Sequence, residues 1–109
     1  MKIAVAAQAA GMASEVDPRF GRAPWFIIYD TEEKSSKDIN NSTNQAQAHG
    51  AGTGSADTIL REKVDTVVAG RFGPKAEAVF QAAGVNIVSW SGGTVEQAVQ
   101  FVCGQQTDG

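Results

Sequence analysis

The stretch TVVAGRFGPKAEAVFQAAGVNIVSW, residues 66–90, has the pattern of a strand, a helix and a second strand. The apolar runs at 66–70 and 85–90 have the length of short buried strands. Between them, four apolar residues recur at the i, i+3, i+4, i+7 spacing of one helix face: Ala76, Val79, Phe80 and Ala83. Pro74 suits the first turn of that helix, and Gly84 suits its C-terminal cap. Strands joined through a helix run parallel, so this stretch predicts an α/β sheet.

The segments before this unit supply more strands and another helix. Residues 2–7, KIAVAA, are predicted as a buried strand, 24–30 as an aromatic and β-branched strand, and 37–41 as a weaker edge strand. Residues 40–54 are polar and rich in glycine, which predicts a loop leading into a helix. The apolar stripe of that helix consists of Ala56, Ile59, Leu60 and Val64.

The order of elements defines the expected fold. Thr94 and Gln97 fit a capping box that begins one more helix. The predicted order is β-β-β-α-β-α-β-α, a ribonuclease-H-like α/β motif with a five-stranded mixed sheet and three helices. Residues 1–104 should form a single domain and 105–109 a flexible tail. The first strand should lie next to the 66–70 strand, and ligands of such sheets bind beyond the carboxyl ends of the strands.

The size and charge of the chain limit the classes of function. Its 109 residues suffice for one domain, and its net charge of −3 argues against broad binding to nucleic acid or membrane surfaces. The single cysteine, Cys103, excludes an internal disulfide and a four-thiolate metal site within one chain. No apolar run has the length of a transmembrane helix, and the N-terminus lacks the long apolar region of a signal peptide. We therefore expect a soluble, cytoplasmic protein.

The tripeptide Arg-Phe-Gly occurs twice, at 19–21 and at 71–73. Each copy lies in a predicted turn beside a strand and is followed by a further cation, Arg22 or Lys75. Because both loops leave the carboxyl ends of strands predicted to be neighbours, we expect the two copies to face each other across one cleft. Arginine presents a planar fork of donors, which suits an anion with several acceptor atoms. The pattern predicts a cationic site on an acidic protein.

Glycines, aromatic rings and helix ends complete this predicted site. Glycine lets backbone N–H groups approach a ligand closely. Pro74 begins one helix and HGAGTG, residues 49–54, begins another, so two positive helix ends would face the anion. The predicted binding residues in these loops are Arg19, Phe20, Gly21, Arg22, Gly50, Gly52, Arg71, Phe72, Gly73 and Lys75. The alternative for any one of them is ordinary turn chemistry.

Three other residues have side chains that metals bind. His49, the single histidine, is either a metal ligand or donor to a sulfide or oxo group, or an ordinary surface or capping residue. Met12 either faces a soft metal through its thioether or fills a gap in the packing. Cys103 fits a semi-buried small hydrophobe in the last helix.

Signals for catalysis are weak in this sequence. The first predicted strand has no carboxylate for the metal site of a ribonuclease-H nuclease, and there is no Gly-x-Ser-x-Gly elbow or Walker lysine motif. The glycine run at 50–54 follows a polar loop rather than a strand, so it is a weak dinucleotide signal. We therefore expect a binding protein rather than an enzyme.

The segments KIAVA, VDPRFGRA, HGAG, AGRFGPKA and AAGVNIV together resemble the dinitrogenase iron–molybdenum cofactor biosynthesis family. The resemblance covers the chain from Lys2 to about Val102. It implies a small ribonuclease-H-like domain that binds, carries or inserts metal–sulfur clusters, and it is strongest to single-domain members that hold a molybdenum–copper sulfide cluster non-covalently. It also implies cluster contacts at 12–22, 49–54 and 71–75. His49, which lies in the second of these segments, is our candidate metal ligand.

By this resemblance, residues 1–104 are a single cluster-binding domain of a non-catalytic carrier or assembly accessory protein. The implied cargo is a molybdenum–copper sulfide cluster, with iron–molybdenum cofactor or an iron–sulfur precursor as alternatives. The implied partners are cluster-donor or cluster-acceptor proteins, with no nucleic acid and no membrane. The cysteine motif of a radical S-adenosylmethionine domain is absent, so the chain is not expected to build the cluster. The residues alone leave two alternatives open: a phosphate- or nucleotide-binding domain or enzyme, and a protein-interaction module.

Overall fold

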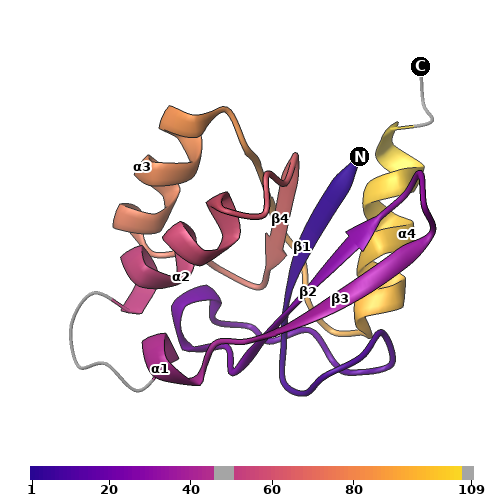
Figure 1. Ribbon diagram of the computed structural model, residues 1–109, viewed down its shortest axis with the longest axis horizontal. Helices are drawn as coiled ribbons and strands as arrows, with labels where there is room; N and C mark the ends of the chain where they lie inside the picture. Colours follow the sequence, from indigo (N-terminus) through magenta and orange to yellow (C-terminus); the bar gives the residue numbers. More distant parts are fainter. Residues whose placement is uncertain (46–50, 107–109) are drawn as a thin grey trace.

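The computed structural model describes residues 1–45 and 51–106, which form one mixed sheet with helices on both faces (Figure 1). The five strands lie in the order β3-β2-β1-β4-β5. β1 pairs antiparallel with β2 and parallel with β4; β3 is antiparallel to β2, and β5 is parallel to β4. The predicted mixed sheet is therefore confirmed, including the contact between the first strand and the 66–70 strand. The strands are β1 (Lys2–Ala7), β2 (Trp25–Asp30), β3 (Ser35–Asn40), β4 (Thr66–Ala69) and β5 (Asn86–Ser89).

The helices lie on two sides of this sheet. Figure 1 shows α2 and α3 on one face and α4 on the other. A 3₁₀ turn, η1, lies in the long connection between β1 and β2. The helical elements are η1 (Phe20–Arg22), α1 (Ser42–Gln45), α2 (Ala51–Leu60), α3 (Pro74–Ala83) and α4 (Val95–Gln106).

Local signals in the sequence explain where α3 and α4 begin and end. Pro74 occupies the first turn of α3, and Gly84 ends the helix with φ of 75°, a left-handed conformation that glycine adopts without strain. At α4, the Thr94 N–H donates to Gln97 Oε1 at 2.9 Å, and the Gln97 N–H donates to Thr94 Oγ1 at 3.2 Å. The predicted capping box is therefore present.

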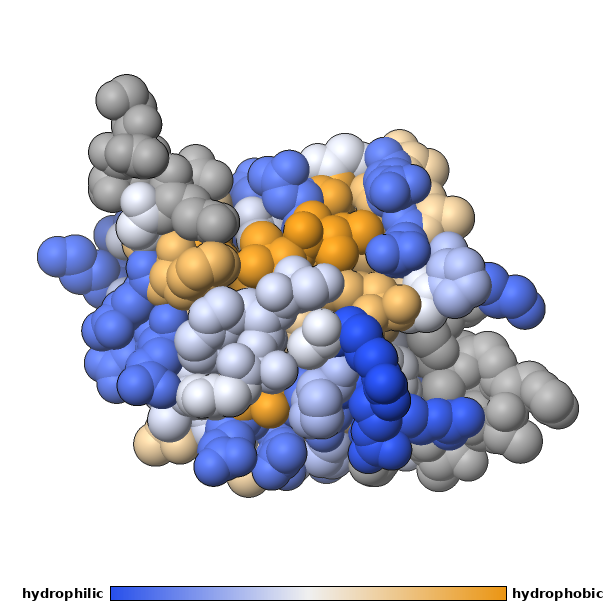
Figure 2. All heavy atoms as spheres, turned by 180° about the vertical axis from the view of Figure 1, so that it is seen from behind, coloured by the Kyte–Doolittle hydropathy of each residue, from blue (hydrophilic) through white to orange (hydrophobic). Residues whose placement is uncertain are grey.

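Apolar side chains fill the space on both faces of the sheet. Ala4 and Ala6 pack toward α2 and α3, whereas Ile3, Val5 and Ala7 pack toward α4. β1 is thus buried on both faces, which explains its unbroken apolar sequence. On the α4 side, Trp90 stacks on Phe101, the ring centroids lying 6.0 Å apart. Figure 2 shows apolar side chains gathered in the middle of the molecular surface seen from behind.

Four features differ from the predictions by more than one residue. β3 begins at Ser35, two residues earlier than expected, and α1 lies in a segment predicted as loop. Val64, predicted on a helix stripe, lies beyond the end of α2 but is still buried, because the chain turns back toward the core there. α4 continues to Gln106, two residues into the predicted tail, since nothing in 104–106 breaks a helix strongly enough to end it earlier.

The strand directions bring several connections to one edge of the sheet. β1, β4 and β5 run parallel and end at this edge, and the register from Ala7 to Trp25 to Asn40 places the start of β2 and the end of β3 beside them. We call this the loop edge, consisting of residues 8–24, 41–45, 70–75 and 90–94. Among the described residues, no helix has both the length and the apolar character needed to cross a membrane.

Candidate functional site

The two Arg-Phe-Gly segments lie side by side at the loop edge. Arg19 and Arg71 form a parallel bridge. The Phe20 N–H donates to the Arg71 carbonyl at 3.1 Å, and the Arg71 N–H donates to the Pro18 carbonyl at 2.8 Å. The pairing of β1 with β4 is therefore continued between the loops that follow them. The prediction that the copies face each other across a cleft is wrong in this respect, because backbone hydrogen bonds join them directly.

A glycine makes this close pairing possible. A Cβ atom on Gly70 would lie 2.7 Å from both the Cα and the carbonyl oxygen of Pro18. Real Cβ atoms essentially never approach backbone so closely, so any other residue would push the loops apart. The Gly70 N–H also donates to the Asp17 carbonyl at 3.3 Å. Gly70 was not among the predicted site residues, although its place directly before the second Arg-Phe-Gly was visible in the sequence.

Asp17 fixes the start of the first copy. Asp17 is 4% exposed, and its Oδ1 accepts a hydrogen bond from the Arg19 N–H at 2.8 Å. The same oxygen lies 3.9 Å from Arg19 Nε, while the Arg19 side chain stays 54% exposed. A carboxylate that accepts from the backbone two residues on is a common way to shape a turn. Asp17 therefore orients Arg19 without burying its guanidinium group.

The phenylalanines of the two copies anchor the loops to the core. The Phe20 and Phe72 rings are stacked with centroids 5.2 Å apart, and Phe20 also packs on Phe26 and Phe80 at 5.2 and 5.3 Å. Phe20 is 1% exposed. The expectation that its ring lines a ligand site needs correction, because the ring lies in the core. Phe72 is half-buried and retains some surface.

Cationic side chains remain at the surface of the loop edge. Arg71 and Lys75 are exposed, and no carboxylate of a described residue lies within 4.0 Å of either side chain. Arg22 is half-buried in η1. Holding several like charges together is unfavourable unless an anion joins them. An anion bound at this edge would offset such repulsion.

The N-terminus of α3 adds backbone donors to the same edge. Gly73 is its N-cap residue, no side chain caps the helix, and Lys75 lies in its first turn. The first N–H groups of a helix have no partner within the helix, and they carry the positive end of its dipole. The N-terminus of α4 is already used, because the Val95 and Glu96 N–H groups donate to the Ser14 and Met12 carbonyls at 2.8 and 3.0 Å.

The structure places the remaining candidates as follows. The Met12 side chain is half-buried against the apolar cluster beneath α4, as is Cys103, which matches the expectation of a small semi-buried hydrophobe. Gly21 is the middle residue of η1, and Gly52 is the second residue of α2. The predictions for His49 and Gly50 concern residues outside the described ranges. Within the described ranges, no group of three or more His, Cys, Asp or Glu side chains is arranged to hold a metal ion.

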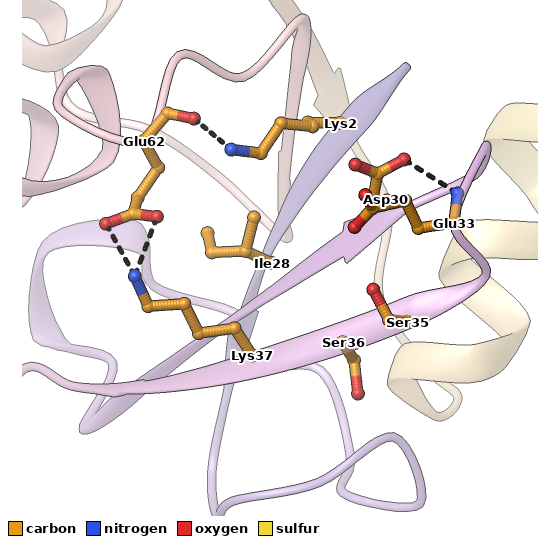
Figure 3. A pocket seen from close by; sticks show the side chains of 8 residues that line it. All are labelled: Lys2, Ile28, Asp30, Glu33, Ser35, Ser36, Lys37 and Glu62. Carbon is orange, nitrogen blue, oxygen red and sulfur yellow. Dashed lines mark hydrogen bonds and ion pairs between the residues drawn. The ribbon is translucent and has the colours of Figure 1, made fainter.

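A pocket of about 220 Å³ lies at the opposite end of the sheet (Figure 3). Its cations already have partners: Lys2 Nζ donates to the Glu62 carbonyl at 2.6 Å, and Lys37 Nζ to the Glu62 carboxylate at 3.1 Å. These contacts tie the edge strand β3 to the turn after α2. These charged residues of the pocket therefore hold β3 and the turn after α2 together. None of the lining residues belongs to the Arg-Phe-Gly loops.

The family model described as "Dinitrogenase iron-molybdenum cofactor" matches residues 1–105. The chain belongs to this family. Among solved structures, the apo form of the orange protein from Desulfovibrio gigas has a TM-score of 0.89 at 39% identity, covering 95% of this chain and 88% of that one. A NifB-like Thermotoga protein assigned to the DUF35 family has a TM-score of 0.83 at 32% identity, covering 94% of this chain and 87% of that one.

A relative of unknown function shares part of the sequence. An uncharacterised protein of Methanocaldococcus jannaschii is 29% identical over 90 residues, covering 81% of this chain and 76% of that protein. These likenesses establish the mixed α/β fold and a small protein of a cofactor-associated family.

Proposed function

We propose that this protein binds and carries an anionic metal–sulfur cluster at the loop edge. The observation that carries the proposal is the direct pairing of Arg19 with Arg71, which brings two cationic side chains to neighbouring positions on one surface. The exposed Lys75 and the uncapped N-terminus of α3 extend the same surface. A sulfide-bridged cluster is a wide polyanion, and guanidinium forks and backbone N–H groups are suitable donors for one.

The proposed cargo brings its own sulfur. Cys103 is the single thiol of the chain. It lies on α4, which covers the face of the sheet opposite to α2 and α3. A cluster held through protein thiolates therefore does not suit this edge, whereas a molybdenum–copper sulfide cluster is chemically complete without them. Iron–molybdenum cofactor and an iron–sulfur precursor are the alternative cargoes, and His49 is proposed as a metal ligand. The protein would act without catalysis, receiving the cluster from a donor protein or passing it to an acceptor.

Reconstitution with tetrathiomolybdate and copper(I) tests the proposal. We expect sulfide-to-metal charge-transfer bands in the visible spectrum and co-elution of molybdenum and copper with the protein on gel filtration. A protein fraction free of both metals would contradict this cargo. Iron–molybdenum cofactor and iron–sulfur precursors would then be tested in the same way.

A phosphate ligand is the second candidate, because an uncapped helix N-terminus beside a lysine also suits phosphate groups. A thermal-shift series with ATP, a dinucleotide, inorganic phosphate and tetrathiomolybdate separates the two. We expect saturable stabilisation by the metal sulfide. Stabilisation by a nucleotide with none by the metal sulfide would instead favour the phosphate ligand.

A further inference from the structure

Asn41 is a buried polar residue at the end of β3, and the polar atoms of its side chain all have partners. It is 1% exposed. Its Nδ2 donates to the Ala23 carbonyl and to Ser55 Oγ, each at 2.9 Å. Its Oδ1 accepts from Asn44 Nδ2 at 2.9 Å, and its backbone N–H donates to the Pro24 carbonyl at 2.8 Å.

These bonds join two segments that carry candidate site residues. Ala23 directly follows η1, which ends at Arg22. Ser55 is 0% exposed and lies on α2, three residues after Gly52. η1 and α2 also pack against each other. Asn41 therefore connects the first Arg-Phe-Gly loop to the middle of α2.

Asn44 extends this connection along α2. Its Nδ2 also donates to Thr58 Oγ1 at 3.2 Å, and Thr58 Oγ1 donates to the Gly54 carbonyl at 3.1 Å. A Cβ atom on Gly54 would collide with the carboxamide of Asn44. Gly54 is thus a glycine because Asn44 occupies the adjacent space, and one member of the glycine run serves this network rather than a ligand.

The hydrogen bonds of this network are directional, whereas the contacts of an apolar core are not. Burying a carboxamide is unfavourable unless its hydrogen bonds are made, so such a residue tolerates few arrangements of its neighbours. Apolar contacts are non-directional and would let α2 slide or rotate by small amounts. A fully satisfied polar network selects one arrangement.

We propose that Asn41 is a positioning residue, which holds α2 at a fixed place relative to the Arg19–Arg22 loop so that both contribute to one anion site. This inference rests on the proposed function of the loop edge. It predicts that breaking the network weakens anion binding more than the accompanying loss of stability explains.

The test compares Asn41→Ala and the milder Ser55→Ala with a control of similar destabilisation, Val102→Ala. Val102 is 1% exposed and lies on α4, where it packs into the other core cluster. The affinity for tetrathiomolybdate with copper(I) is measured at a temperature where all variants are folded. We expect about tenfold weaker binding for Asn41→Ala, a smaller loss for Ser55→Ala, and parent-like binding for Val102→Ala. If Asn41→Ala does not fold, the affinity of Ser55→Ala relative to Val102→Ala tests the inference.

Amide NMR spectra without ligand provide the second readout. In Asn41→Ala and Ser55→Ala, shifts should change at residues 20–24 and 51–56, whereas Val102→Ala should leave the shifts of both segments unchanged. Parent-like binding by Asn41→Ala and Ser55→Ala, equal losses in all three variants, or unchanged shifts would each overturn the inference. If the parent itself fails to bind the probe, the proposed function fails, and the NMR shifts then decide whether Asn41 positions the two segments.

Discussion

Arg19 and Arg71 occupy equivalent places on two paired segments, yet their surroundings differ. The Arg19 backbone and Nε lie near the buried Asp17 carboxylate, whereas no described carboxylate lies within 4.0 Å of the Arg71 side chain. An anion that binds Arg71 therefore does not compete with an existing ion pair, because the Arg71 guanidinium group makes none within the described chain. We expect Arg71 to contribute at least as much to anion binding as Arg19.

Replacement of either arginine by alanine should weaken cluster binding by about tenfold to a hundredfold, because a charge-assisted contact contributes about 1.5–3 kcal/mol. The free energy of unfolding should change by no more than about 0.5 kcal/mol, since both side chains are on the surface. Lysine should restore part of the affinity, because it keeps the charge but loses the planar fork. Titration of the charge-transfer bands measures the affinity.

Arg61→Ala is the matched control, because Arg61 is also exposed but lies just after α2, away from the loop edge. It should bind like the parent. Parent-like binding by both Arg19→Ala and Arg71→Ala would show that the repeated motif is turn chemistry only.

Gly70→Ala should destabilise the protein by about 1–3 kcal/mol, the usual cost of forcing atoms into a packed region. Its Cβ would lie 2.7 Å from the backbone of Pro18, which has no flexible end to move aside. Gly73→Ala is the comparison, because no atom lies within 4 Å of a Cβ there and φ is −77°. Urea unfolding of the two variants gives the difference, and equal stabilities would contradict the close packing of the loops.

Among the elements, α4 begins with two reciprocal bonds and also supplies N–H groups to the 8–16 loop. Thr94→Ala removes the acceptor for the Gln97 N–H and should cost about 1 kcal/mol of unfolding free energy. Thr94→Ser keeps that acceptor and should cost little. Thermal unfolding of both variants checks this, and an equal loss in Thr94→Ser would assign the effect to the methyl group.

The turn between β2 and β3 depends on Asp30. The N–H groups of Glu33 and Glu32 donate to its Oδ1 at 3.2 and 2.9 Å, and these bonds lower the pKa of the carboxyl below its ordinary value of 3.8. Because the pKa of this carboxyl is lower in the folded state, its ionised form stabilises the folded protein. This contribution to the free energy of unfolding is fully present above pH 3.8, and it is lost as the pH falls through the folded-state pKa. The stability difference between the parent and Asp30→Asn should therefore be present at neutral pH and shrink in acid. A difference that grows as the pH falls would contradict this assignment.

At the scale of the whole molecule, charge is distributed unevenly. The chain has a net charge of −3, yet four of its nine cationic residues belong to the two Arg-Phe-Gly segments and the residues just after them. An anion approaching the loop edge is attracted locally while the remaining surface repels it. This uneven distribution would steer an approaching anion to the loop edge.

Affinity for tetrathiomolybdate should fall as salt is added, because the screening length shortens from about 30 Å at 0.01 M to about 3 Å at 1 M ionic strength. An uncharged osmolyte at matched osmolality should have little effect, which separates screening from changes in water activity. Binding titrations over this range provide the measurement, and an affinity independent of salt would indicate that apolar or covalent contacts dominate.

Much of the fold could be predicted because its signals are local. The apolar runs, the helix stripe from Ala76 to Ala83, Pro74, Gly84 and the Thr94–Gln97 capping box each depend on neighbours within a turn or two. Strand-helix-strand alternation then required parallel pairing, and with it the meeting of the two Arg-Phe-Gly loops at one edge.

The remaining features depend on residues far apart in the chain, which no local pattern encodes. The direct pairing of Arg19 with Arg71 depends on the register between β1 and β4, and the burial of Phe20 depends on Phe72 and Phe80 arriving beside it. The buried role of Asn41 has no local signal in the sequence, because its partners Ala23 and Ser55 lie 18 and 14 positions away. The amino-acid order thus determined which elements form and which edge carries the cations. Tertiary packing decided which of those residues face solvent and which hold the edge together, because burial is a property of the assembled neighbours.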